Sequence, residues 1–263
     1  MNFSNLAGRL GKWLLGEVSF YSGLLSLLYF AVVKPFAKGS RGNRFIYPIT
    51  IQQVYFTGVQ AGGLISMIAF ALGVAIIAGL HSSPVNVNAY LGKILVIAVI
   101  QTLGPLVTAI IVIARSGTAI STEIANMVIR NEILALEAMA IDTLNFLVLP
   151  RILGMVISLL CLNLIFSAVS VLGGVAVAWI FDPNMDLALF FNNFFESLTW
   201  GDLAQAGLKS VFFGCGISLV CMINGFKVLM YPGGVPVSGI KGVVGSLQWV
   251  FVINAVLTVL FII

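Results

Sequence analysis

Long apolar runs without a single charged residue are the feature that most constrains how this chain can fold. The run from residue 54 to residue 80, for example, contains no Asp, Glu, Lys or Arg. Over the whole chain 60% of residues are hydrophobic and 8% are charged, whereas a soluble globular domain carries roughly 25% charged residues. With so few charges, most of the surface must face lipid, so the sequence predicts an all-α membrane protein.

Five apolar runs, three of them without any charged residue and two with a single lysine, are long enough to cross a bilayer, which takes about 20 apolar residues in a helix. A transmembrane β-barrel is disfavoured, because its strands would alternate polar and apolar residues and these runs are apolar on every side. We therefore predict one five-span domain over residues 54–263. Its predicted spans are residues 54–80, 91–114, 152–181, 203–226 and 242–263.

Residues 1–53 are predicted to form an N-terminal elbow at the membrane surface. Apolar residues recur at three- and four-residue spacing between Phe3 and Leu14, with basic residues off that stripe, which is typical of a helix in the headgroup plane. The apolar stretch 18–33 is short for a span. It therefore either lies in the interface or forms an extra crossing.

The basic residues fall almost entirely on one side of this topology. The chain has 13 Lys and Arg residues, and all except Lys93 and Lys209 lie on the side that carries residues 34–53 and 115–151. The positive-inside rule makes that side cytoplasmic. Five crossings then place the N-terminus in the cytoplasm and the C-terminus on the outer side. The bases form no patch interleaved with aromatic residues, so no nucleic-acid partner is expected.

Motifs for catalysis, metal binding and nucleotide binding are missing from the sequence. There is no GxSxG, HExxH or CxxC motif, the single histidine is His81, and the three cysteines lie inside apolar runs. No GxxxxGK[ST] motif occurs, so we expect no P-loop nucleotide site. No charged residue is expected deep in a span, which argues against a proton relay or a voltage sensor. We predict no catalytic residue, no metal site and no cofactor.

A charged segment, residues 115–151, separates the second predicted span from the third. Within it, residues 131–142 (NEILALEAMAID) have the pattern of a short helix with an apolar stripe and acidic flanks. Such a helix either rests on the membrane or docks into a groove of a cytoplasmic partner. The acidic flanks favour docking, because anionic lipid would repel them. The candidate docking residues are Glu123, Arg130, Glu132, Ile133, Leu136, Glu137, Met139 and Asp142.

Two glycine motifs inside the spans suggest packing and hinge positions. Gly58 and Gly62 form a GxxxG pair, which either lets another helix approach closely or merely loosens its own helix. Gly104-Pro105 falls in the middle of the second span, where proline predicts a kink.

Several motifs resemble the signature region of MlaE-type permeases, the membrane subunits of ABC transporters that work with MCE-domain lipid-binding proteins. The resemblance is carried by LGP at 103–105, ARSG at 114–117, TEI at 122–124 and ILALEAMAID at 133–142, and NGF at 224–226 is similar to a later motif. Thr102 stands where an acid is expected in the family.

This resemblance implies a homodimer of permeases in the inner membrane, with the C-terminus in the periplasm. Two cytoplasmic ABC ATPase subunits would bind ATP and Mg²⁺ and drive the permease through the docking residues. A ring of MCE-domain proteins on the outer side would exchange phospholipid with it. The function implied is that of a transport subunit without its own nucleotide site.

Within this hypothesis, lipid would follow a path along the first two spans. Gln101 and Thr102 are polar groups inside a span, so their side of the helix should face protein or a cavity. Arg115 either braces the charged segment by contacting Glu123 or snorkels at the inner interface. The candidate lipid-pathway residues are Met67, Phe70, Leu72, Val74, Gln101 and Thr102.

Two other functions remain as alternatives. A membrane-embedded lipid-modifying enzyme needs a reactive polar cluster at one depth, and none is visible in the sequence. A secondary transporter moves its substrate without a nucleotide-hydrolysing partner and often contains an inverted repeat, which the sequence does not reveal.

Overall fold

The computed structural model describes residues 43–81, 91–140, 143–181, 187–228 and 233–262. This part of the chain is helical throughout and contains no strand, which confirms the predicted all-α class. Most of the predicted N-terminal elbow and Asp142 lie outside the described residues. The elements, with π-helical segments written η, are α2 (Asn43–Val54), η1 (Tyr55–Val59), α3 (Gln60–His81), α4 (Leu91–Leu95), η3 (Val96–Leu103), α5 (Gly104–Val112), η4 (Ile113–Gly117), α6 (Thr118–Ile129), α7 (Glu132–Ala138), η5 (Leu144–Val148), α8 (Leu149–Phe181), α9 (Leu187–Ser197), α10 (Trp200–Phe226) and α11 (Gly234–Ile262).

Five continuous helices in the described ranges are long and apolar enough to cross a membrane, as predicted. They comprise Tyr47–Gly79, Gly92–Ile129, Phe146–Ile180, Trp200–Phe226 and Gly234–Phe261.

The second span continues 15 residues beyond its predicted end at Ala114, so the first part of the charged segment is helix rather than loop. Ile120, Ile124 and Ala125 of this extension are buried, because α6 packs against α10 and α11. The Ser121 hydroxyl also donates a hydrogen bond to the carbonyl of Ser238 in α11, at 2.9 Å. Contacts with distant parts of the chain therefore extend the helix.

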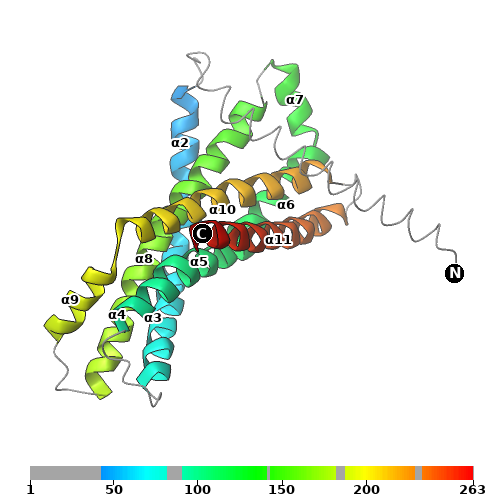
Figure 1. The fold of residues 1–263 in the computed structure, drawn as a ribbon. Helices are drawn as coiled ribbons and strands as arrows, with labels where there is room; N and C mark the ends of the chain where they lie inside the picture. The colour runs from blue at the N-terminus through cyan, green and yellow to red at the C-terminus, as the bar shows by residue number, and fades with distance from the viewer. Residues whose placement is uncertain (1–42, 82–90, 141–142, 182–186, 229–232, 263) are drawn as a thin grey trace, which may run out of the picture.

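The spans alternate in direction, so the loops gather at two ends of the molecule (Figure 1). One end carries α2 and α7, and the opposite end carries α9 with the last turns of α3 and α8. We call these the α7 end and the α9 end. Span α10 is the most buried and packs on α8, α6 and α11, whereas α11 is the least buried.

Small residues let α3 and α8 pack closely. A Cβ atom on Gly73 would overlap the carbonyl oxygen of Ser170, and one on Gly174 would lie 2.7 Å from Cδ1 of Ile77. Within the predicted GxxxG pair only Gly58 makes such a contact, with Ser158 at 3.2 Å, while Gly62 has open space around it. The close approach of these two helices therefore depends on glycines that the GxxxG pattern did not identify.

Proline changes the winding of two spans instead of breaking them. The π-helical segment Val96–Leu103 comes just before Pro105, and Leu144–Val148 comes just before Pro150. A proline has no backbone N–H to donate to the preceding turn, and wider π turns rearrange the hydrogen bonds there. The predicted Gly104-Pro105 hinge therefore coincides with an irregular stretch of helix.

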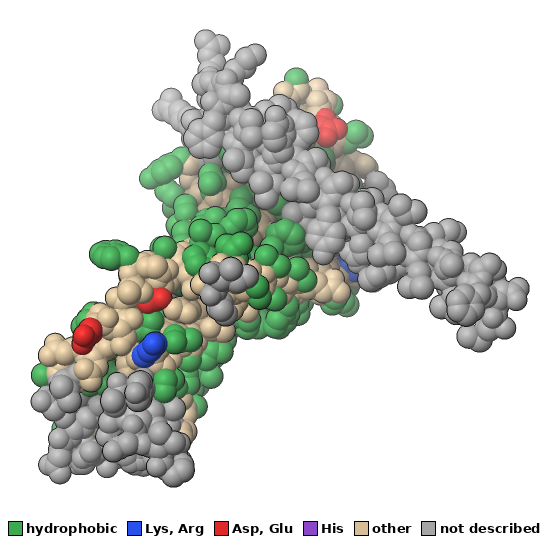
Figure 2. Space-filling model, viewed as in Figure 1, with side chains coloured by type: hydrophobic (Ala, Val, Ile, Leu, Met, Phe, Trp, Pro, Cys, Tyr) green, Lys and Arg blue, Asp and Glu red, His purple; other side chains and the backbone are tan. Residues whose placement is uncertain are grey.

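The surface agrees with a lipid environment. Figure 2 shows hydrophobic side chains over the middle of the visible face, with the few charged ones toward its ends. Trp179 and Trp200, both near the α9 end, are exposed, as in the aromatic belt of a membrane interface.

Replacing Gly73 by alanine tests the α3–α8 contact. The new Cβ would overlap backbone, so we expect a loss of about 1–3 kcal/mol in unfolding free energy and a clearly lower melting temperature in detergent. Gly62→Ala in the same helix is the matched control, because it fills open space and removes a helix-interior glycine. It should leave stability unchanged or slightly raised. Equal melting temperatures for the two variants would contradict the packing described here.

Candidate functional site

The α7 end carries a short helix that stands away from the packed spans. Helix α7 is only seven residues long and lies within the predicted 131–142 helix. It is set off by two left-handed residues, Asn131 (φ 57°) just before it and Ala140 (φ 58°) just after it. Two such residues reverse the chain sharply at each side of α7. The loop between the second and third spans therefore presents a compact helical tip (Figure 1).

The side chains of this tip are largely exposed to solvent. No residue of α7 is buried, and Leu134 and Met139 are 64% and 70% exposed. The acids Glu132 and Glu137 are exposed as well. An exposed apolar and acidic helix of this kind is typical of an element that docks on another protein.

An ion pair joins the two spans that lead into and out of α7. Arg151 of α8 lies 3.0 Å from Glu123 of α6, with 7% of the Arg151 side chain and 62% of the Glu123 side chain exposed. Because Arg151 is buried, the carboxylate of Glu123 neutralises a charge that would otherwise be costly. The pair therefore fixes α6 to α8 at the base of the helical tip.

This pairing corrects the expected contact between Arg115 and Glu123. The Arg115 guanidinium instead donates a hydrogen bond to Oε1 of Gln60, at 2.5 Å. The two residues lie eight positions apart, roughly 12 Å along a helix, which is too far for a direct contact.

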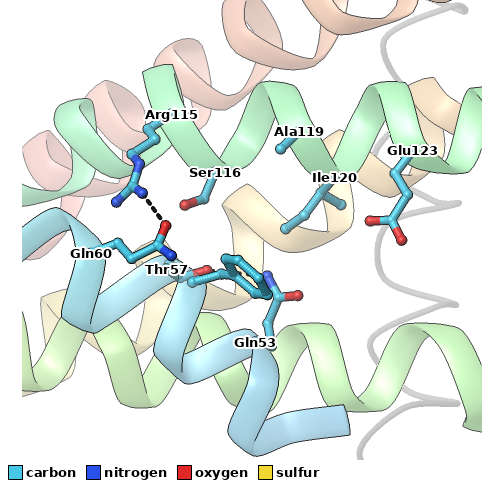
Figure 3. Close-up of a pocket in the computed structure, with 9 residues that line it drawn as sticks. Gln53, Thr57, Gln60, Arg115, Ser116, Ala119, Ile120 and Glu123 are labelled. Atoms are coloured by element: carbon cyan, nitrogen blue, oxygen red, sulfur yellow. Dashed lines mark hydrogen bonds between the residues drawn. The ribbon is translucent and has the colours of Figure 1, made fainter.

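A pocket of about 200 Å³ lies between these two separate contacts (Figure 3). One wall comes from α2, η1 and α3, and the other from η4 and α6. We call it the Arg115 pocket. Its polar lining consists of Gln53, Thr57, Gln60, Arg115, Ser116 and Glu123, and its apolar lining of Phe56, Ala119 and Ile120.

A second polar cluster lies toward the α9 end and corrects the prediction that no charged residue lies deep in a span. The side chain of Lys209 is fully buried in α10. Its Nζ donates to the backbone carbonyl of Gln101 and to the hydroxyl of Thr258, each at 3.0 Å. Pro105 has no N–H to offer the Gln101 carbonyl four residues earlier, so the lysine supplies a donor there.

The predicted lipid-pathway residues fall into two groups. Met67 and Phe70 are exposed on α3, whereas Leu72 and Val74 are half-buried. Gln101 donates to Asp202 of α10, at 2.6 Å, and Thr102 donates to the carbonyl of Ile97. Gln101 therefore faces protein, one of the two surroundings expected of it, whereas the Thr102 hydroxyl bonds within its own helix.

Sequence reasoning missed Gln60, Arg151 and Lys209 as members of these clusters. Lys209 is a lone base inside an apolar run, and Arg151 follows the proline that starts α8. Their partners lie on other helices, and the sequence does not show which way a side chain points. Among the described residues, no group of three or more His, Cys, Asp or Glu side chains is placed to hold a metal ion.

A double-mutant cycle tests the link between Lys209 and Pro105. Lys209→Met removes the donor to the Gln101 carbonyl and should lower the unfolding free energy by about 1–3 kcal/mol. In a Pro105→Ala background the new backbone N–H can donate to the same carbonyl. Lys209→Met should then cause a smaller loss of unfolding free energy, as measured by thermal unfolding in detergent. Identical costs in both backgrounds would contradict the assigned role of Lys209.

Comparison with known proteins identifies relatives of this chain. The permease protein MlaE of the intermembrane phospholipid transport system in Haemophilus influenzae is 27% identical over 219 residues, 81% of this chain and 82% of the relative. A probable ABC transporter permease protein of Rickettsia conorii is 26% identical over 261 residues, 98% of each chain. The chloroplastic protein TRIGALACTOSYLDIACYLGLYCEROL 1 of Arabidopsis thaliana is 26% identical over 216 residues, 81% of this chain and 61% of that protein.

The family described as permease MlaE matches residues 50–260, which include nearly all of the five spans. This chain, a multi-pass helical membrane protein, belongs to the MlaE permease family of ABC transport subunits.

Proposed function

We propose that this chain is the permease subunit of an ABC transporter that moves phospholipid between the inner membrane and an MCE-type lipid-binding partner. A separate ATPase drives it. The exposed α7 tip is the observation that carries the proposal, because a subunit without its own P-loop motif has to receive motion from a partner. The names of the relatives, which include an intermembrane phospholipid transport permease, support the choice of substrate.

In this proposal the α7 end faces the cytoplasm. Its basic residues favour that orientation under the positive-inside rule, because the opposite end exposes only Lys93 among the described Lys and Arg residues. The N-terminus would then be cytoplasmic and the C-terminus periplasmic. The described bases at the α7 end are Arg44, Arg115, Arg130, Arg151, Lys227 and Lys241.

The proposed assembly is a homodimer with two cytoplasmic ATPase subunits and an outward ring of MCE-domain proteins. ATP and Mg²⁺ bind to the ATPase subunits, and the permease itself needs no cofactor. Each α7 sits in a groove of one ATPase, with Leu136 and the exposed Leu134 toward the groove and Glu132 and Glu137 at its rim, while Ile133 packs against the core of this chain. This arrangement matches the apolar stripe and acidic flanks of the helix.

Motion passes from α7 into the membrane through its two neighbouring spans. When ATP draws the ATPases together, α7 moves with them, and the Glu123–Arg151 pair makes α6 and α8 move as one unit. The π-helical stretch before Gly104-Pro105 absorbs part of the displacement, since wide turns are easier to rewind than a regular helix. The space between the two protomers then narrows and releases phospholipid toward the outer partner.

A paired substitution tests the docking role of α7. Leu136→Asp with Glu137→Lys places a charge on the apolar stripe and reverses a charge on the flank, so copurification of the ATPase should fall at least about tenfold. Membrane insertion should be unchanged, because both residues lie outside the packed spans.

Phe195→Asp with Glu196→Lys is the matched control. It makes the same two changes on exposed residues of a short helix at the opposite end, α9, and should leave ATPase copurification unchanged. If the α7 pair also leaves copurification unchanged, the docking role is wrong.

A further inference from the structure

We propose that the Arg115 pocket binds the headgroup of a single phospholipid, with the phosphate at Arg115 and an aminoalkyl group directed toward Glu123. The inference rests on the proposed phospholipid transport and adds a binding site and a preferred headgroup.

The pocket lies at the depth of lipid headgroups. Lys93 and Arg115 are exposed residues at the two ends of the charge-free part of the second span. A helix rises about 33 Å between them, close to the roughly 30 Å thickness of the hydrocarbon core. Arg115 therefore lies at the membrane surface on the α7 side, where phosphate groups are found.

The charges of the pocket favour an anion at one end. Arg115 and Glu123 are its two charged lining residues, but Glu123 is already paired with Arg151. Within the described residues, the Arg115 guanidinium makes one hydrogen bond, to Gln60. An arginine has five N–H donors in a planar fork that suits phosphate. Figure 3 shows Gln60 and Ser116 beside the Arg115 side chain, and their amide NH₂ and hydroxyl groups are further hydrogen-bond donors for a phosphate.

The opposite end suits a cation. Glu123 pairs with Arg151 through Oε1, and its carboxylate is largely exposed at the far end of the pocket from Arg115 (Figure 3). The two residues are separated by roughly 12 Å along the helix, so the phosphate and the amino group of one headgroup lie between them. A zwitterionic headgroup therefore satisfies both ends, whereas a glycerol headgroup satisfies only the first.

The pocket is large enough for a headgroup, but the acyl chains must lie outside it. A volume of about 200 Å³ is too small for two acyl chains. Phe56 and Gln60 of the pocket begin an exposed helical stripe that continues through Gly63, Met67 and Phe70. From Gln60 to Phe70 the helix rises about 15 Å, roughly one leaflet. The acyl chains would lie along this stripe, which contains two of the predicted lipid-pathway residues.

Photocrosslinking in the assembled transporter tests the site. The full-length chain, with p-benzoylphenylalanine in place of Phe56, is purified with its partners and reconstituted in vesicles that contain radiolabelled phosphatidylethanolamine or phosphatidylglycerol. We expect crosslinks to phosphatidylethanolamine, and Arg115→Gln should reduce them at least about tenfold. Arg115→Lys, which keeps the charge but not the fork, should give an intermediate yield. Lys93→Gln, which removes an exposed cation from the other end of the same span, should have no effect.

Two further arms separate a specific site from bulk lipid contact. The same probe in place of Phe195, near the α9 end, should label both lipids equally. Its crosslinking yield should not change in the Arg115→Gln variant. Glu123→Gln should shift labelling at Phe56 toward phosphatidylglycerol, because it removes the carboxylate and leaves Arg151 unpaired.

The outcomes distinguish this site from the proposed function. If the complex moves phospholipid with ATP but labelling at Phe56 is independent of Arg115, the site is wrong and the function stands. A crosslink from Phe56 back to its own chain also overturns the site, because protein then fills the pocket. If labelling depends on Arg115 while no ATP-driven movement occurs, the site stands and the proposed function fails.

Discussion

The absence of water from the hydrocarbon core is the constraint on which this structure depends. Every backbone N–H and C=O group there must find a partner inside the protein, so the described chain crosses the membrane only as helices. The same constraint explains the irregular positions. Where Pro105 withdraws a donor, the helix before it is wound as a π-helix, and the buried Lys209 donates to the carbonyl of Gln101. A charged residue is thus retained in the membrane-spanning region as a hydrogen-bond donor to an irregular backbone.

The polar groups that remain are arranged by depth. At the α7 end, the Glu123–Arg151 pair joins the two spans that flank the exposed helical tip, and Arg115 lies beside a pocket at the level of the lipid headgroups. Between the two ends, α3 and α8 approach through glycine and carry an apolar surface. A force applied at α7 would therefore reach α6 and α8 first. These spans border α10, the most buried helix of the fold.

The number and rough position of the spans were predictable because an apolar run of more than 20 residues with at most one charge has few alternatives. The short helix α7 was predictable too, because its apolar stripe and acidic flanks lie within one short stretch of sequence. The end of the second span was placed too early, at Ala114, because Arg115 has the appearance of a loop residue. The helix continues since Ile120 and Ile124 are buried against α10 and α11, more than 75 residues away in sequence. The partners of Lys209 and Arg151 were missed for the same reason, because each pair joins different helices.

The central claim is that this subunit receives its motion through α7. The most direct measurement is the distance between spin labels on Met139 of the two protomers of the proposed homodimer, in the assembled transporter with and without ATP. A label on Phe195 provides the reference at the opposite end. The account predicts that the Met139 distance shortens when ATP binds and recovers after hydrolysis. An unchanged Met139 distance in a complex that is moving phospholipid would contradict it.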